Sequence, residues 1–132
     1  MLPEANKELI ARILEAISTG DTSVLAEHPG YRITAERLPM LRSAFPDLSA
    51  TIVKQVAEGD HVATYCRMSG THSGMFLGLA PTGKVIQYQQ IAVDRIENGK
   101  VTEHNGAPDF LQVFRQLGIT DFSPLSIKPA PS

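Results

Sequence analysis

The sequence predicts a single α+β domain in which helices come first, a curved antiparallel sheet of four strands follows, and a short helix closes the fold. Apolar residues in the first third of the chain recur every three or four positions, which is typical of amphipathic helices. After residue 47 the chain alternates between β-branched and polar residues, as strands do. Short turns join these strands, so neighbours should pair antiparallel. We expect the domain to occupy residues 1–120 and residues 121–132 to form an extended tail.

Three helices are expected before the sheet. The first covers residues 3–19, where the apolar residues form one stripe and a glycine follows. A short second helix begins after residue 21 and ends before the segment 28–30. The third is expected over residues 34–45, where Pro39 either marks its start or kinks it. The stripe of the first helix consists of Leu9, Ile10, Ile13, Leu14 and Ile17.

Two favoured hairpin turns organise the sheet. Gly59-Asp60 joins the first two strands, and Asn98-Gly99 joins the last two. A loop over residues 72–83 separates these hairpins, and a helix over residues 108–117 follows them. A sheet of this kind that curls around helices leaves an apolar pocket suited to a small hydrophobic molecule. The predicted strands cover residues 49–58, 61–71, 84–96 and 100–106.

Composition and charge exclude several classes of partner. The chain has 132 residues and a net charge of −2, and its 12 basic residues form no cluster, so we expect no nucleic-acid partner. No apolar run approaches the roughly 18 residues of a membrane-spanning helix, so we expect no membrane partner. Cys66 is the only cysteine, and the first residues lack the pattern of a signal peptide. We therefore expect a cytoplasmic protein.

A series of short motifs follows the third predicted helix. It comprises Ser43-Ala44-Phe45-Pro46-Asp47, Gly70-Thr71-His72-Ser73-Gly74, Phe76, Gly78, Pro81-Thr82-Gly83-Lys84, Asn98-Gly99-Lys100-Val101, Glu103-His104, Asp109 and Gln116-Leu117-Gly118. In this order and spacing the series resembles the SnoaL-like polyketide cyclases of the NTF2-like superfamily. The resemblance runs from about residue 41 to residue 119, with a weaker helical match over residues 4–21.

The resemblance implies a cone-shaped NTF2-like barrel that forms a homodimer or homotetramer through its sheet. It also implies an enzyme without metal or organic cofactor that closes a ring in, or isomerises, a small apolar carbonyl compound of the polyketide type. In such cyclases an aspartate near the last strand and the closing helix acts as general acid/base, and Asp109 occupies the matching position. Relatives with the same cone include isomerases, dehydratases, epoxide hydrolases and binding domains, so the fold alone does not fix the function.

Two interpretations of Asp109 are open. As a general base it would remove a proton next to a carbonyl and later protonate the new alkoxide. Alternatively, it is a carboxylate in the first turn of the closing helix, where the helix dipole and free N–H groups favour negative charge. His72 lies in a glycine-flanked loop, where it either reaches the pocket as a catalytic group or fixes the loop. For His72 we favour the loop-fixing role.

Alternation along the last two strands selects further pocket residues, since adjacent side chains point to opposite faces. Counting from Val101 places Glu103 and Asn105 inward and His104 outward, unless a bulge at Gly106 changes the order. A histidine or asparagine in the pocket could hydrogen-bond a substrate oxygen, so His104 is also a catalytic candidate. The candidates for substrate binding are Asn105, Glu103, Tyr88, Gln90 and Phe76.

Two other functions stay open at this point. The family commonly has a tryptophan where this chain has Asn105, and the region between residues 20 and 37 is short and lacks a clear strand. The enzyme is the leading hypothesis, and these departures motivate a second one, a non-catalytic protein that binds a hydrophobic ligand in the same cup. A hydrolase or dehydratase on this fold would instead need a second acid or base close to Asp109.

Overall fold

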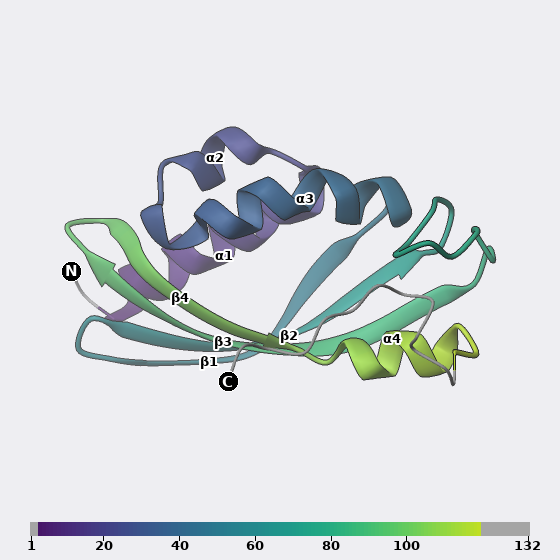
Figure 1. Cartoon of the computed structure of the whole chain (residues 1–132). Helices are drawn as coiled ribbons and strands as arrows, with labels where there is room; N and C mark the ends of the chain where they lie inside the picture. Colours follow the sequence, from purple (N-terminus) through teal and green to yellow (C-terminus); the bar gives the residue numbers. More distant parts are fainter. Residues whose placement is uncertain (1–2, 120–132) are drawn as a thin grey trace, which may run out of the picture.

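Four antiparallel strands form the sheet and follow one another in chain order, β1-β2-β3-β4 (Figure 1). This computed structural model describes residues 3–119, so the predicted tail at 121–132 lies outside the described residues. The arrangement confirms the predicted fold class. The elements are α1 (Pro3–Thr19), α2 (Thr22–Ala26), the 3₁₀ helix η1 (Pro29–Tyr31), α3 (Arg32–Ala44), β1 (Ser49–Glu58), β2 (His61–Thr71), β3 (Val85–Glu97), β4 (Lys100–Pro108) and α4 (Phe110–Gln116).

Helix α3 and strand β4 depart slightly from the predicted boundaries. Helix α3 begins at Arg32 rather than at residue 34, because η1 runs directly into it. Pro39 therefore lies inside the helix and does not mark its start. Strand β4 continues to Pro108, which pairs with Gln90, so α4 begins two residues later than predicted.

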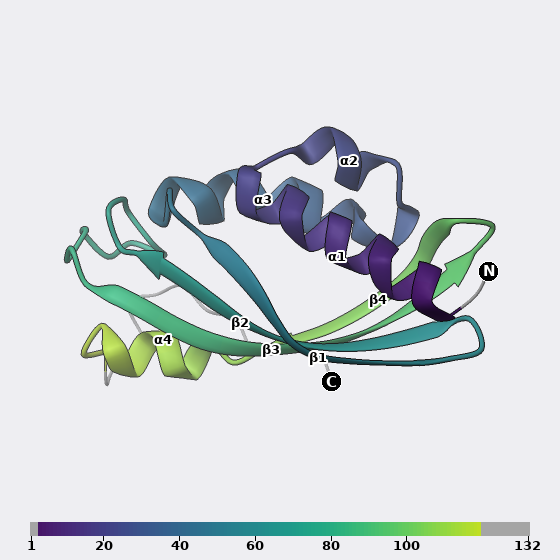
Figure 2. The same ribbon diagram turned by 180° about the vertical axis from the view of Figure 1, so that it is seen from behind.

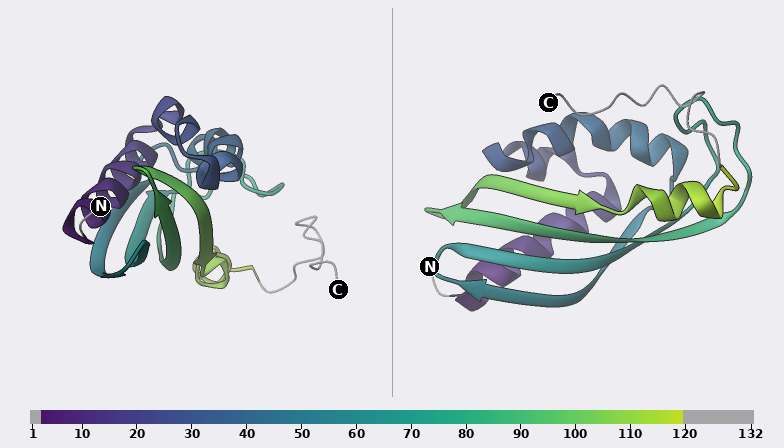
Figure 3. Two further views of the ribbon diagram at one scale, coloured as in Figure 1. Left: turned by 90° about the vertical axis from the view of Figure 1, so that its left-hand side faces the viewer. Right: turned by 60° about the horizontal axis from the view of Figure 1, so that its bottom comes forward.

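Helices α1, α2 and α3 lie over the concave face of the sheet, whereas α4 lies beyond the end of β4 (Figures 1 and 2). Seen from the side and from below, the strands twist and curve under the helices (Figure 3). The core lies between the two layers, and each large apolar side chain buried there contributes roughly 1.5–3 kcal/mol. Its least exposed members include Ile10, Ile13, Leu25, Leu38, Val62, Ile86 and Val101.

Two β-bulges bend the sheet. In β1 the pairing moves from Ile52 to Lys54, so Val53 has no partner on β2. In β4 it moves from Glu103 to Val101, so Thr102 has no partner on β3. A bulge of this kind bends its strand and increases the local twist, which helps the sheet to curve around the helices.

Strand β4 pairs with β3 only from Gln90 onward, so the first residues of β3 have no neighbouring strand on that side. Two glutamine side chains of α4 form hydrogen bonds with the backbone there instead. The side-chain oxygen of Gln112 accepts a hydrogen bond from the Gln89 backbone N–H at 3.0 Å. Gln116 accepts from the Gln87 N–H at 2.8 Å and donates to the Gln87 carbonyl at 2.6 Å. These bonds satisfy backbone groups at an otherwise open sheet edge.

Arg42 joins the helical layer to the start of the sheet. Its guanidinium donates to the carbonyl oxygens of Ser18 at 2.8 Å and Ile17 at 3.3 Å, at the end of α1. It also donates to the carbonyls of Leu48 at 3.1 Å and Pro46 at 2.7 Å, just before β1. One half-buried side chain thus links the end of α1 to the turn between α3 and β1.

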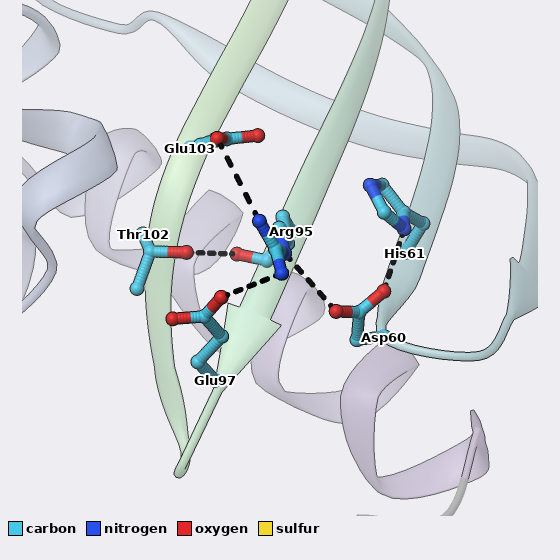
Figure 4. Close-up of polar contacts among 6 residues, drawn as sticks. All are labelled: Asp60, His61, Arg95, Glu97, Thr102 and Glu103. Atoms are coloured by element: carbon cyan, nitrogen blue, oxygen red, sulfur yellow. Dashed lines mark hydrogen bonds and ion pairs between the residues drawn. The ribbon is translucent and has the colours of Figure 1, made fainter.

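Ion pairs on the outer surface link the β1–β2 turn to β3 and β4 (Figure 4). Arg95 Nε lies 3.0 Å from Asp60 Oδ2, and Arg95 Nη2 lies 2.9 Å from Glu97 Oε1. Glu103 Oε1 is more distant, 3.9 Å from Arg95 Nη1. Since the pairs are exposed to solvent, each contributes little to stability.

The outer face of the sheet carries several exposed apolar side chains, among them Val56, Ile91 and Val93. The assembly through the sheet and the cytoplasmic location both stay predictions. Within residues 3–119, no helix combines the length and apolar character needed to cross a lipid bilayer.

His28 is buried beside a second hollow, which lies between α1, α2 and the β3–β4 turn. Its Nδ1 accepts a hydrogen bond from the Val101 backbone N–H at 3.1 Å, so the neutral ring carries its proton on Nε2. Burial, together with the nearby Lys100, lowers the pKa of His28 below its ordinary value of 6.5. Protonation of Nδ1 would break this bond.

We expect Arg42→Met to lower the free energy of unfolding by about 2–3 kcal/mol, because four backbone carbonyls, three of them in partly buried hydrogen bonds, lose a charged donor. Urea denaturation followed by circular dichroism measures the change. The matched control is Arg12→Met, since Arg12 is exposed and makes no hydrogen bond within the described residues. Equal midpoints for the two variants would show that the Arg42 contacts do not stabilise the fold.

The fold should also lose stability in acid through His28. Because its pKa is lowered in the folded state, the unfolded chain binds a proton more readily. The contribution of the neutral ring is therefore complete above a pH of about 6.5 and decreases as the pH falls below it. Urea denaturation at several pH values should show a weaker pH dependence for His28→Asn, which keeps an acceptor but does not titrate. Gln89→Asn, at an exposed residue that does not titrate, should keep the original dependence.

Candidate functional site

A cavity of about 790 Å³ lies between α3 and the concave face of β2, β3 and β4. Its walls are mainly apolar, and only a few polar side chains enter it. This combination is typical of a site that binds a small organic molecule. The apolar lining includes Leu14, Leu38, Cys66, Met68, Phe76 and Phe110, and the polar lining includes Tyr31, Gln90, Asp94 and His104.

Asp94 and His104 face each other across β3 and β4, where they are register partners. Asp94 Oδ1 lies 2.5 Å from His104 Nδ1, and the Asp94 side chain has no exposed surface. Since an aspartate carboxylate only accepts hydrogen bonds, His104 Nδ1 carries the proton that joins them. The other ring nitrogen, Nε2, then holds a lone pair beside the cavity.

Tyr31 completes this group from η1, which is distant in the sequence. Its hydroxyl donates to Asp94 Oδ2 at 3.3 Å, and its ring stacks on that of His104 with centroids 4.2 Å apart. Burial, reinforced by the negative charge of Asp94, raises the pKa of Tyr31 well above its ordinary value. The phenol therefore stays protonated and acts as a donor.

Gly30 allows η1 to approach the sheet closely enough for this contact. A Cβ atom at residue 30 would lie 3.0 Å from backbone atoms of Glu103 in β4, which is tighter than most real contacts. Only glycine therefore fits without moving η1. The close approach places Tyr31 over His104 and Asp94.

The predicted orientation of β4 is wrong for three residues. His104 points into the cavity, whereas Glu103 and Asn105 are exposed and do not line it. The cause is the bulge at Thr102, which adds one residue after Val101 and reverses the alternation. Val101 is buried as predicted. The positions of Glu103 and Asn105 give no support to their predicted role in substrate binding.

Asp109 precedes α4 and is exposed, and it does not line the cavity. Its backbone N–H donates to the Gln89 carbonyl at 2.9 Å, but its side chain makes no capping hydrogen bond. The assignment of Asp109 as the base stays a prediction that this position does not favour. A catalytic Asp109 would require the substrate to extend beyond the cavity.

His72 is fully buried in the loop that joins β2 to β3. Its Nδ1 accepts from the Thr82 backbone N–H at 3.2 Å, and its own backbone N–H donates to the Lys84 carbonyl at 2.9 Å. Its ring packs near Phe45, and His72 does not line the cavity. These contacts fit the loop-fixing interpretation.

Three predicted binding residues do line the cavity, namely Tyr88, Gln90 and Phe76. Burial raises the pKa of Tyr88 above its ordinary value, so this phenol also stays protonated. Sequence reasoning missed Asp94 and Tyr31. The alternation that selected Tyr88 and Gln90 continues to Asp94, whereas no local signal marks Tyr31. Within residues 3–119, no group of three or more His, Cys, Asp or Glu side chains is arranged to hold a metal ion.

Comparison with solved structures confirms the fold. TsrD from Streptomyces laurentii superposes with a TM-score of 0.79 at 28% sequence identity, over 91% of this chain and 99% of that chain. AclR, a proposed hydroxylase from Streptomyces galilaeus, superposes with a TM-score of 0.83 over 91% of this chain and 89% of that chain. At 24% identity the AclR match shows the shared fold alone.

Comparison with curated sequences gives the family. The chain is 29% identical to the aklanonic acid methyl ester cyclase DauD from Streptomyces sp. (strain C5). The alignment is 147 residues long with its gaps, and it covers 94% of this chain and 88% of that protein. The chain is 30% identical over 129 residues to the aklanonic acid methyl ester cyclase DnrD from Streptomyces peucetius, over 84% of this chain and 89% of that protein. The family model described as SnoaL-like polyketide cyclase matches residues 7–117. The chain therefore belongs to the SnoaL-like polyketide cyclase family.

Proposed function

We propose that the chain closes a ring in a small, largely apolar carbonyl compound of the polyketide type, with His104 as general acid/base and Asp94 as its partner. The observation that carries the proposal is the hydrogen-bonded pair of Asp94 and His104, which borders an apolar cavity. DauD and DnrD, the two curated relatives described above, are aklanonic acid methyl ester cyclases, which supports cyclase activity. We take that ester as the first substrate to test.

The proposed reaction is an intramolecular aldol addition. His104 Nε2 removes a proton from the carbon next to one carbonyl, and the resulting enolate carbon attacks a second carbonyl of the same molecule. A carbon–carbon bond forms while the electron pair of the attacked C=O bond moves to its oxygen. His104 then returns the proton to this oxygen, so the product is an isomer of the substrate and no redox step is needed.

Asp94 supports both proton transfers. When His104 takes up the proton, the ring becomes a cation, and the carboxylate 2.5 Å from Nδ1 stabilises that charge. The apolar walls of the cavity strengthen this interaction, because little water screens it. Asp94 also fixes the ring with its Nε2 lone pair available beside the cavity.

The two alternative functions have less support. A hydrolase or dehydratase was expected to need a second acid or base near Asp109, and among the described residues none is hydrogen-bonded or ion-paired to that side chain. A pure binding protein would not need the Asp94–His104 pair beside its cavity. The experiment below separates this alternative from catalysis.

We expect His104→Gln to lower kcat for ring closure of aklanonic acid methyl ester on the order of 100- to 10,000-fold, because the acid/base group is lost. Asp94→Asn should also lower the rate, since an amide cannot stabilise the charged ring. Asp109→Asn should keep nearly the original rate. Because substrate and product have the same mass, chromatography with ultraviolet detection measures the conversion.

His61→Gln is the matched control, because His61 is exposed and lies at the start of β2, away from the cavity. If Asp109→Asn abolishes turnover and His104→Gln does not, the base is Asp109 and the proposal is wrong. If the unaltered protein binds the ester and releases it unchanged, the binding-protein interpretation replaces it for this compound.

We expect Tyr31→Phe to lower the free energy of unfolding by about 1–3 kcal/mol, because it leaves buried Asp94 Oδ2 without its donor. The variant should also close the ring more slowly, since Asp94 is then less firmly placed. Urea denaturation and the chromatographic assay measure the two effects. Tyr65→Phe is the control, because Tyr65 lies one position from Cys66 on β2 and outside the cavity lining. Identical behaviour of the two variants would count against this role of Tyr31.

A further inference from the structure

We infer that a gap beside Gly106 is the subsite for the carbonyl oxygen that becomes the alkoxide, with Gln90 and His104 as its two hydrogen-bonding partners. The inference rests on the proposed function, because His104 is the group that delivers the proton. It adds a substrate requirement, namely a ketone whose oxygen can enter this gap. It also gives Gln90 a defined role.

The gap follows from the missing side chain at residue 106. Gly106 lies opposite Ala92 in the β3–β4 register, so two small residues meet at this point of the cavity wall. A Cβ atom built on Gly106 would lie 3.0 Å from His104 Nε2 and 3.7 Å from Gln90 Nε2. An oxygen atom near that point is thus within hydrogen-bonding distance of His104, and a small movement of the Gln90 amide completes the second bond.

Both nitrogens lack a protein partner there. Within the described residues, the side chain of Gln90 makes no hydrogen bond, although it is half-buried and lines an apolar cavity. His104 uses Nδ1 for Asp94 and leaves Nε2 without a protein partner. A half-buried amide in apolar surroundings gains from a partner that a ligand supplies. Two such groups around one gap therefore favour an oxygen as the occupant.

The subsite gives each group a step in the reaction. The Gln90 N–H donates to the ketone oxygen and polarises the C=O bond that the enolate carbon attacks. As the new carbon–carbon bond forms, the electron pair of the C=O bond moves to this oxygen. Protonated His104 then donates the Nε2 proton to it. In the bound product, the new hydroxyl donates to His104 Nε2 and accepts from Gln90.

Gly106 is needed for space rather than for backbone freedom. Its φ does not lie in the left-handed region, so alanine can adopt the same backbone conformation. The methyl group of Gly106→Ala would occupy the place of the oxygen. This makes the variant a steric probe of the subsite, and Ala107→Ser is its matched control, because Ala107 is exposed and does not line the cavity.

The first test is binding, and it needs no turnover. 2-Naphthol carries one hydroxyl and mimics the bound product, whereas 2-methylnaphthalene has nearly the same shape without the oxygen. We expect the unaltered protein to bind 2-naphthol roughly 10-fold more tightly, as one to two net hydrogen bonds would give. Gln90→Leu and Gly106→Ala should lose this preference, whereas Gln89→Leu and Ala107→Ser should keep it. Titrations followed by NMR measure the affinity of each protein for both compounds, and circular dichroism checks that each variant is folded.

The second test is the rate with aklanonic acid methyl ester. Gln90→Leu should lower kcat on the order of 100-fold with little change in KM, because the donor acts mainly on the developing alkoxide. If His104→Gln abolishes turnover while Gln90→Leu and Gly106→Ala retain full kcat and the preference for 2-naphthol, the subsite is wrong and the proposed function stands. If the unaltered protein does not cyclise the ester but the two variants lose the preference, the subsite stands and the proposed function fails for that substrate.

Discussion

A buried carboxylate is stable only when hydrogen bonds compensate for the water it has lost. Asp94 of β3 is such a carboxylate, and its need for partners constrains β3, β4 and η1. It has no exposed surface, and its two oxygens are bonded to His104 of β4 and Tyr31 of η1. Three features make these two bonds possible. The β3–β4 register and the bulge before His104 place its ring opposite Asp94, and the close approach of η1 at Gly30 brings Tyr31 to them. The same contacts hold the reactive ring at the cavity wall.

The curvature of the sheet determines what kind of chemistry the cavity can host. The bulges at Val53 and Thr102 bend the strands around the helical layer, and the enclosed space is lined mainly by apolar side chains. In such surroundings a charge that appears on His104 during proton transfer is stabilised chiefly by Asp94. Fold and reactivity are therefore coupled, because a flatter sheet would admit water and weaken this interaction.

Local patterns predicted the fold better than the site. Helical periodicity and two-residue turns depend on neighbours in the chain, so the order of elements and most of their limits could be predicted. The site depends on contacts between distant residues, since Tyr31 and Asp94 are 63 positions apart. The bulge at Thr102 reverses which residues of β4 face inward, and no residue type marks it. Asp94, in contrast, follows from the alternation that selected Tyr88 and Gln90, extended by two more inward positions.

The hydrogen bonds of the Arg42 guanidinium have a consequence for how this chain can evolve. All four of its acceptors are backbone carbonyl oxygens, which every amino acid possesses. Ile17, Ser18 and Leu48 can therefore be exchanged for other residues without loss of the acceptor, whereas the arginine cannot. In an alignment of relatives, Arg42 should be constant and should have no covarying partner. Methods that infer contacts from correlated substitutions would then overlook the side chain that fastens the helices to the sheet.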